Sequence, residues 1–259
     1  MAKKYKVNSF EGYQRIISPE NSDIKKMNFS VIRNKKNLNY KGTTNGEESV
    51  FVLTEGNVKF FLGNNLLAEM MRKNVFSEPP SAIYLPPYTE YFIEFSEDSE
   101  ICIAGCQARG TGKPKLIEPK DMLFSRKGQD GYLRSVTEIV NENFPSEKLI
   151  LGETISDPGN WVSYPPHKHD TDNLPEEVAM EEIYYFKINP RTGFGTIRVF
   201  SDSEDNIFVV KNSEIVTIPS GYHPISVAPG HQIYYLWIMA GETKKFVSYI
   251  HPDYRFLEK

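Results

Sequence analysis

Residues 82–95 read AIYLPPYTEYFIEF, and residues 215–227 read IVTIPSGYHPISV. Each stretch is a run of β-branched and aromatic residues, a proline-containing turn and a second apolar run, a pattern typical of two strands joined by a reversal. When the two stretches are aligned, Pro86 falls on Pro219 and Glu90 falls on His223. The same unit therefore occurs once in each half of the chain, which predicts an internal duplication.

A second pair of matching segments lies upstream of these units. Glu48 opens the run SVFVLTEGNVKFFLG, and Glu182 opens IYYFKINPRTGFGTIRVF. Similar short apolar runs occur along the whole chain, separated mostly by Gly, Pro, Asn, Asp or Ser. Helical periodicity is weak, and one of its better candidates is residues 64–73. The sequence therefore predicts an all-β fold.

The histidines distinguish the two halves. No histidine occurs before residue 167, and all five lie in the second half. Residues 108–147 contain glycines, isolated prolines and polar runs, which are typical of a linker. We predict two β-barrel, jelly-roll-like lobes, residues 1–140 and 141–259, with no metal ligands in the first lobe and any imidazole site in the second.

Composition excludes several classes of protein. The 259 residues are 39% hydrophobic and 25% charged, with a formal net charge of -4, which is typical of a globular protein and disfavours nucleic acid as a partner. The longest uncharged apolar run, residues 233–241, is less than half of a membrane span, and the first residues lack the apolar core of a secretory signal. We expect a cytoplasmic protein without a membrane partner, in which Cys102 and Cys106 are reduced core residues.

The densest group of potential metal ligands lies in the segment YPPHKHDTDNLPEEVAMEEIYYF. Alternate residues of a strand share a face, so His167 and His169 are expected to point the same way. Glu182 opens the next strand, and a hairpin-like return would bring its carboxylate beside the imidazoles. His223 follows the turn IPSGY, where Gly221 can take the positive φ that lets the chain reverse toward the same place.

Three neutral imidazoles and one carboxylate suit a divalent ion such as Zn, Mn, Fe or Ni, with positions left open for substrate oxygens. The order H-x-H, E and P-x-G-x-H favours such a site, whereas His231 and His251 are interpreted as ordinary hydrogen-bonded histidines. Glu181 is the alternative to Glu182. Strand parity favours Glu182, because it shares an inward face with Tyr184.

These motifs, in this order on a β-rich chain, resemble the cupin superfamily, and two lobes resemble a bicupin. The strings NWVSYPPHKHDTDNLPEE, EEIYYF, IPSGYHP and YYLWIMAG are similar to the 5-deoxy-glucuronate isomerase (IolB) family. The resemblance is strong over residues 150–241 and loose over the first lobe. The long interval between His169 and Glu182 is typical of this family rather than of general cupins. Trp237 departs from the family string, which has a polar Asn there.

The resemblance implies an enzyme of myo-inositol catabolism that isomerises an aldose to a ketose, converting 5-deoxy-D-glucuronate to 5-dehydro-2-deoxy-D-gluconate. A metal held by His167, His169, Glu182 and His223 would stabilise an enediolate. The partner would be a small-molecule sugar acid, with a homo-oligomer as a possible assembly. Two alternatives stay open: a metal-dependent cupin dioxygenase, and a non-catalytic sugar-binding bicupin.

The isomerisation also needs a base and a group that binds the carboxylate of the substrate. Glu177 and Asp170, in the acidic loop, are the candidates for the base, with Glu176 or a metal-bound water as the next choice. Tyr184 could donate a hydrogen bond to a substrate hydroxyl or be a core aromatic residue. Arg198, on the predicted strand GTIRVF, is the candidate for binding the carboxylate, and Arg191 is its alternative.

Overall fold

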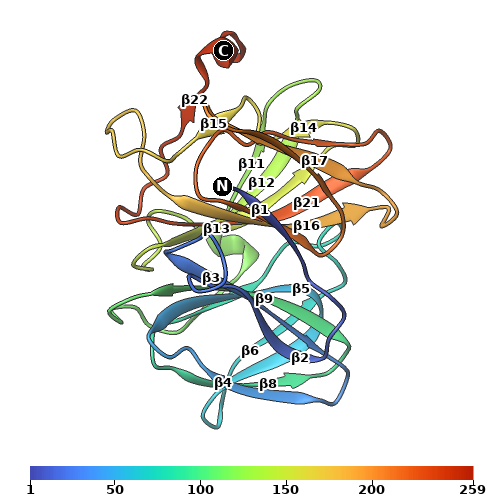
Figure 1. Cartoon of the computed structure of the whole chain (residues 1–259). Helices are drawn as coiled ribbons and strands as arrows, with labels where there is room; N and C mark the ends of the chain where they lie inside the picture. Colours follow the sequence, from blue (N-terminus) through green and yellow to red (C-terminus); the bar gives the residue numbers. More distant parts are fainter. Residues whose placement is uncertain (259) are drawn as a thin grey trace.

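The computed structural model describes residues 1–258 and consists almost entirely of strands, as predicted (Figure 1). The strands are β1 (Lys3–Lys6), β2 (Gly12–Ile17), β3 (Met27–Asn34), β4 (Asn39–Thr43), β5 (Glu47–Leu62), β6 (Asn65–Arg72), β7 (Ala82–Leu85), β8 (Glu90–Phe95), β9 (Ser99–Gln107), β10 (Lys115–Ile117), β11 (Leu123–Lys127), β12 (Arg134–Val140), β13 (Leu149–Ser156), β14 (Trp161–Val162), β15 (His167–Lys168), β16 (Glu181–Asn189), β17 (Gly195–Phe200), β18 (Asp205–Val210), β19 (Glu214–Ile218), β20 (Ile225–Val227), β21 (Gln232–Ala240) and β22 (Tyr249–Ile250). Within the described residues, the helical elements are two short 3₁₀ turns, η1 (Pro119–Asp121) and η2 (Pro252–Leu257).

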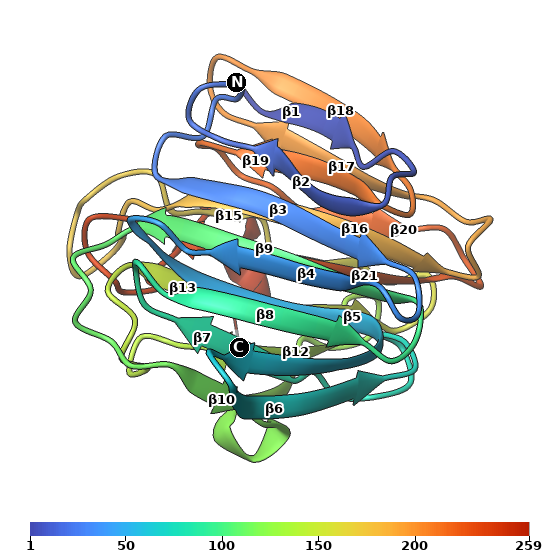
Figure 2. The ribbon, with the colours of Figure 1, turned by 90° about the horizontal axis from the view of Figure 1, so that it is seen from below.

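Two large antiparallel sheets share one strand order. The first contains the path β10-β7-β5-β9-β3-β2, and the second runs β1-β19-β16-β21-β13-β12-β11. From the second to the sixth position, the strands of the two paths follow the same order along the chain, whereas β10 comes after its neighbours in the chain and β1 comes before its own. Strands of the first half lie side by side in Figure 2, and Figure 1 places β1, at the N-terminus, among the strands of the second half.

The predicted closed barrels are not formed. The second sheet ends at β1 and β11, and a separate four-stranded sheet, β14-β20-β17-β18, is not joined to it by a hydrogen-bonded ladder. The two sheets instead share a core of side chains that includes Tyr184, Ile197, Val199 and Ile225. Apolar packing therefore closes this part of the molecule where strand pairing does not.

Strand pairing also crosses the predicted boundary between residues 140 and 141. Strand β1 pairs with β19, and the hairpin β11–β12 pairs with β13, so these segments extend the second sheet. The chain changes sheet between β10, which pairs with β7, and β11. The division into lobes at residue 140 stays a prediction, but the segment predicted as a linker contains two strands of the second sheet.

The helical candidate at residues 64–73 is wrong, because this segment is β6 and pairs with β5. Its burial alternates: Ala68, Met70 and Arg72 are buried, whereas Met71 is exposed. Pairing along the neighbouring strand therefore overrides the weak helical pattern. Cys102 and Cys106 are buried free thiols, as expected.

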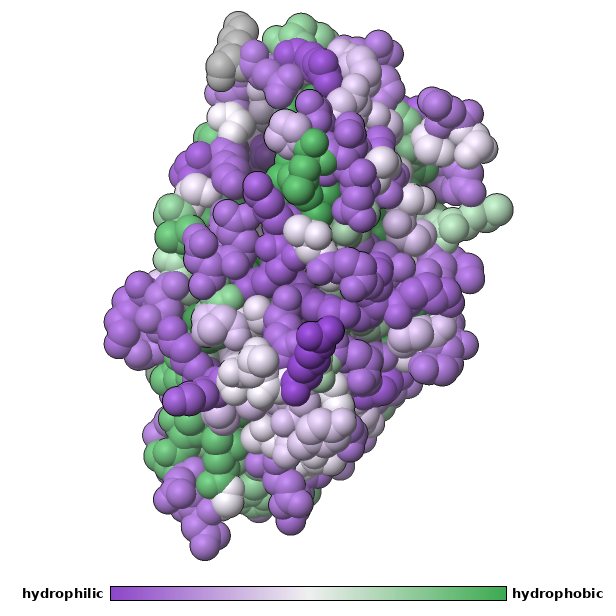
Figure 3. All heavy atoms as spheres, turned by 90° about the vertical axis from the view of Figure 1, so that its left-hand side faces the viewer, coloured by the Kyte–Doolittle hydropathy of each residue, from purple (hydrophilic) through white to green (hydrophobic). Residues whose placement is uncertain are grey.

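The surface seen in Figure 3 is mainly hydrophilic, and its apolar residues form small separate patches. Within residues 1–258, no helix is long and apolar enough to cross a membrane.

Candidate metal centre and its cavity

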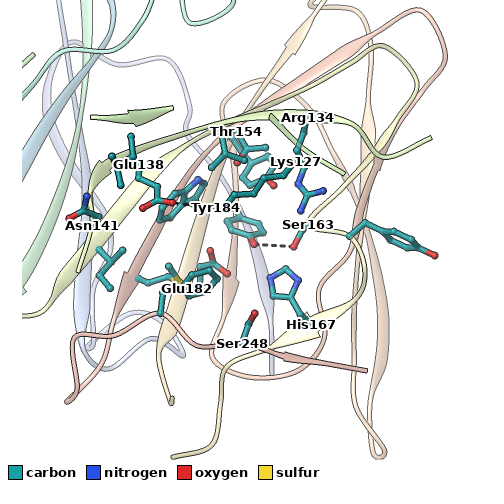
Figure 4. A pocket seen from close by; sticks show the side chains of 18 of the residues that line it. Lys127, Arg134, Glu138, Asn141, Thr154, Ser163, His167, Glu182, Tyr184 and Ser248 are labelled. Atoms are coloured by element: carbon teal, nitrogen blue, oxygen red, sulfur yellow. Dashed lines mark hydrogen bonds and ion pairs between the residues drawn. The ribbon is translucent and has the colours of Figure 1, made fainter. Parts of the chain in front are cut away.

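A cavity of about 450 Å³ lies against one face of the second sheet. Period-two alternation accounts for its wall, because every second residue of a strand faces the same side. The polar residues that the sheet contributes are Lys127 on β11, Arg134 and Glu138 on β12, Thr154 on β13, and Glu182 and Tyr184 on β16 (Figure 4). Ser163, His167 and Ser248 come from segments outside this sheet.

One carboxylate and two imidazoles form a compact buried cluster in the second half. The ligand atoms of His169, Glu182 and His223 all lie within 4.8 Å of one another. Glu182 Oε2 is 3.2 Å from His169 Nε2 and 3.3 Å from His223 Nε2. The ring of His167 is centred 4.9 Å from that of His223, at the edge of the cluster. The structure thus brings together the four residues that the sequence selected.

Backbone carbonyls fix the orientation of the three imidazoles. The Nδ1 atoms bond to the carbonyls of Pro165 for His167 (3.0 Å), Met180 for His169 (2.8 Å) and Gly221 for His223 (2.8 Å). A carbonyl only accepts hydrogen bonds, so each Nδ1 carries the proton and each Nε2 of a neutral ring is an acceptor. This is the arrangement that usually orients metal-ligating histidines.

The cluster therefore contains acceptors without a donor. In these tautomers, Nε2 of His169 and Nε2 of His223 both face a carboxylate oxygen of Glu182, which is also an acceptor. Nε2 of His223 is buried and has no hydrogen-bond partner within residues 1–258. A cation between these atoms would satisfy all three, so the donor set fits a divalent metal.

Burial is the largest single influence on the pKa of each residue of the cluster, although other groups outweigh it at His169. It lowers the pKa of His167 to about 4, assisted by His169, Arg134 and Lys127, and it lowers the pKa of His223 well below the usual range. Burial raises the pKa of Glu182, although His169 opposes the rise. For His169, burial disfavours the charged ring, but the hydrogen bond that the protonated ring donates to Glu182 outweighs it and raises the pKa.

The turn before His223 is built as the sequence predicts. Gly221 has φ +95°, and a Cβ there would lie 2.9 Å from the Phe200 carbonyl oxygen. Its N–H donates to Asp170 Oδ2 at 2.8 Å. Asp170 therefore ties the turn that carries His223 to the segment that carries His169.

The predicted base candidates do not line the cavity. Lys168 binds the carboxylate of Glu177, with both oxygens 2.9 Å from Nζ, and also pairs with Asp170. Glu177 is buried and accepts further bonds from the backbone N–H groups of Asp170 and Thr171. Asp170 pairs with Lys168 and accepts from the N–H of Gly221, and it is not among the residues that line the cavity. This cluster braces the loop instead of facing the cavity.

The two predicted carboxylate-binding arginines also lie outside the cavity. Arg198 points outward from β17, where its Nε is 2.8 Å from Asp205 Oδ1. Arg191 is exposed, 3.9 Å from Glu55. Both were selected by residue type alone, and each is instead paired with a nearby acid at the surface.

Parity correctly separated Glu182 from Glu181. The Glu181 carboxylate accepts from the backbone N–H groups of Lys25 and Lys26, at 2.8 and 2.9 Å, outside the cluster. Tyr184 is buried and lines the cavity, with its hydroxyl 3.4 Å from Ser163 Oγ (Figure 4).

Sequence reasoning missed the charged residues of the β11–β12 hairpin because this segment was interpreted as a linker. Arg134, Val136 and Glu138 alternate along RSVTEIV and all face the cavity, so period two was the available signal. Trp237 also lines the cavity. Its indole packs where a side chain at Gly152 would stand, so glycine is required at that position.

The first half lacks an equivalent cluster among the described residues. Strand register corrects the proposed match of Glu48 with Glu182. Leu85 and Ile218 are equivalent, because each directly precedes an aligned proline. Leu85 pairs with Ser49 and Ile218 pairs with Glu182, so the equivalent of Glu182 is Ser49. Glu48 points to the opposite side, where it accepts the backbone N–H groups of residues 147–149 at 2.7–2.9 Å.

The arrangement of strands is the fold of a cupin. A cupin 2 conserved barrel domain protein from Leptotrichia buccalis shares the fold, with a TM-score of 0.50, 14% identity, and coverage of 92% of this chain and 96% of that one. The chain belongs to the KduI/IolB family, whose model matches residues 3–257. This confirms the resemblance inferred from the sequence.

Two family relatives match nearly the full chain. A protein from Geobacillus kaustophilus (strain HTA426), named 5-deoxy-glucuronate isomerase, is 36% identical over 248 residues, which are 94% of this chain and 90% of that protein. The crystal structure of an IolB-like protein from Salmonella typhimurium LT2 has a TM-score of 0.94 and 27% identity, and 99% of each chain is covered.

Proposed function

We propose that this protein is an aldose–ketose isomerase that converts 5-deoxy-D-glucuronate to 5-dehydro-2-deoxy-D-gluconate. Family membership and the shared name of the relatives support this reaction. The observation that carries it is the convergence of His169, Glu182 and His223, of which Glu182 lines a cavity large enough for a small sugar acid, as does the neighbouring His167. The matching strand orders support a bicupin.

His169, Glu182 and His223 would hold the metal, and His167 would complete the set from the edge of the cluster. Zn, Mn, Fe and Ni all suit this donor set. When bound, the metal supplies a Lewis acid that polarises the substrate's carbonyl oxygen and the neighbouring hydroxyl oxygen.

The chain's own residues must move one proton between adjacent carbons. The carbon-bound proton leaves the carbon that bears the hydroxyl and is returned to the aldehyde carbon, and the hydroxyl proton passes to the former aldehyde oxygen, so that one carbon becomes a ketone and the other a primary alcohol without an external oxidant. We assign this transfer to Glu138, a cavity carboxylate outside the imidazole cluster. Burial raises the pKa of Tyr184 well above its usual range, so its hydroxyl stays protonated and donates to a substrate oxygen.

The reaction is tested by incubating the metal-loaded protein with 5-deoxy-D-glucuronate while NMR follows aldehyde loss and an electrode follows dissolved oxygen. We expect conversion to the ketose at constant oxygen concentration. Oxygen consumption coupled to substrate loss would instead identify a dioxygenase. Saturable binding without turnover would identify a sugar-binding bicupin.

A further inference from the structure

The cavity wall contains one arginine whose charge is not neutralised by a neighbouring acid. Resting on the proposed function, we infer that Arg134 is the carboxylate-binding residue of the cavity and selects short polyhydroxy acids with a carbonyl at the other end. The inference uses a residue of β12, outside the cluster described above.

Other arginines of the chain show how unusual Arg134 is. Six form ion pairs: Arg15 with Glu47, Arg33 with Glu100, Arg72 with Glu153, Arg126 with Asp157, Arg191 with Glu55, and Arg198 with Asp205. Arg109 and Arg255 have no acidic partner within residues 1–258, but both are exposed to solvent. Arg134 alone combines partial burial, a place in the cavity wall and the lack of an acidic partner in that range.

Most donors of Arg134 are therefore available. Its Nη1 donates a hydrogen bond to the Tyr132 carbonyl oxygen, at 3.2 Å. Lys127 is the paired residue on β11, but its ammonium lies 3.8 Å from Glu138 Oε1. A guanidinium can bind both oxygens of a carboxylate, and partial withdrawal from water strengthens that interaction. Of the lysine and the arginine in this wall, Arg134 is thus the one without an acidic neighbour within the described residues.

The position of Arg134 fits a substrate that reaches the imidazole cluster. Figure 4 shows its side chain directed toward Ser163 and His167, across the cavity. Hydroxyls of Ser163, Thr154 and Tyr184 also line the cavity. A polyhydroxy acid can therefore place its carboxylate at Arg134 and its hydroxyls at these groups, leaving its carbonyl for the cluster.

The test compares Arg134→Met, Arg134→Lys and the matched control Arg198→Met, all metal-loaded. Isothermal titration measures binding of D-glucuronate and of D-glucose, which lacks the carboxylate, and kinetics measures turnover of 5-deoxy-D-glucuronate. We expect Arg134→Met to weaken D-glucuronate binding and raise KM by about 10- to 100-fold, the usual effect of losing a charged hydrogen-bonding partner. D-glucose binding, kcat and metal content should change little. Arg134→Lys should be intermediate, and Arg198→Met should match the wild type.

The inference is overturned if Arg134→Met prefers D-glucuronate over D-glucose as strongly as the wild type, or if the wild type has no such preference. Arg134→Lys provides the comparison if the methionine variant does not fold. Failure of the proposed function gives a different result: the wild type would not isomerise 5-deoxy-D-glucuronate, while the Arg134-dependent preference for D-glucuronate would remain.

Discussion

Each imidazole of the cluster is anchored at Nδ1 by a backbone carbonyl, which leaves Nε2 of the ring for another partner. A side chain held this way does not need the metal to define its direction. Removing one ring should therefore affect metal binding more than folding, because an open catalytic site contributes less to stability than a closed structural one.

His169→Ala tests this at the centre of the cluster. We expect a sharp loss of bound metal with an unchanged circular dichroism spectrum, because one of the three converging ligand atoms is removed while Glu182 and His223 keep their places. His167→Ala should lose less metal, since His167 lies at the edge. Elemental analysis after dialysis measures both, with His231→Ala as the control outside the cavity. Unchanged metal content in His169→Ala would exclude it as a ligand.

Glu138→Gln tests the assignment of the proton transfer. It keeps the shape of the side chain but cannot accept the substrate proton, so the rate should fall by about 10² to 10⁴ with metal content preserved. Wild-type turnover in deuterated water should place deuterium at the former aldehyde carbon of the product. Full activity of Glu138→Gln would show that another group is the base, whatever the isotope result. Missing deuterium alone would not decide the matter, because a shielded base can return the same proton.

Strands and turns position the residues of the His/Glu cluster. The charged loop after β15 does so within a short stretch of sequence. Lys168 is partly buried between Asp170 and Glu177, and Asp170 in turn accepts a hydrogen bond from the N–H of Gly221. This group of Lys168, Asp170 and Glu177 joins the segment that carries His169 to the turn that carries His223. Its function is positional, so its loss should alter both stability and metal affinity.

Lys168→Met should leave two carboxylates close together without their shared cation. We expect the protein to lose about 1–3 kcal/mol of unfolding free energy, because partly buried acceptors are left without their donor. Metal affinity should fall as well, although no ligand is changed. Urea unfolding and metal titration measure the two effects, and Lys35→Met, which removes an exposed pair with Asp98, is the control. If Lys168→Met has the unfolding free energy and the metal affinity of the wild type, the Lys168 ion pairs do not position the histidines.

Local pattern predicted the strands and the proximity of His169, Glu182 and His223, because alternation and turn chemistry depend on near neighbours. Glu177 and Asp170 were selected as acids of the loop over the expected mouth, but the structure pairs both with Lys168, a contact that spacing alone does not reveal. Arg134 and Glu138 are different: they enter the site because the β11–β12 hairpin pairs with β13. Sheet order is set by contacts distant in sequence, which composition and spacing do not encode.

Buried ion pairs join the two large sheets of the whole molecule. Glu100 on β9 binds Lys187 on β16 at 2.8 Å and Arg33 on β3 at 2.7 Å. Burial alone would raise the pKa of Glu100, but these two cations outweigh it and hold the pKa at about 2, against an ordinary value of 4.5. The folded state therefore binds this proton more weakly than the unfolded chain.

This difference fixes the sign of a pH dependence. Because the folded pKa is depressed, Glu100 contributes its full stabilisation above about pH 4.5 and loses it progressively as the pH falls toward about 2. We expect unfolding free energy to decline over that window, with a shallower decline in Glu100→Gln. Urea titrations at a series of pH values measure the slope. Equal slopes in the two proteins would assign the acid sensitivity to other carboxylates.

The second link between the sheets is the bidentate pair of Arg72 on β6 with Glu153 on β13, at 2.7 and 2.8 Å. Both side chains are almost inaccessible, at 1% and 3% exposure, and the Tyr234 hydroxyl donates to the same carboxylate at 2.6 Å. Arg72→Met would bury Glu153 without its cation, which typically costs about 3–5 kcal/mol. The exposed pair of Arg126 with Asp157 is the control, and Arg126→Met should cost less than about 1 kcal/mol.

The double variant Arg72→Met/Glu153→Leu separates loss of attraction from the cost of an unpaired charge. If the single variant is unstable because a carboxylate is stranded between the sheets, removing that carboxylate as well should restore much of the lost unfolding free energy. Denaturant unfolding followed by circular dichroism and by tryptophan fluorescence measures both variants. Both tryptophans, Trp161 and Trp237, lie in the second half, so coincident transitions by the two probes would show that the halves unfold together. A double variant no more stable than Arg72→Met would mean that the other bonds of Arg72, to the Leu53 and Glu78 carbonyls, carry its contribution.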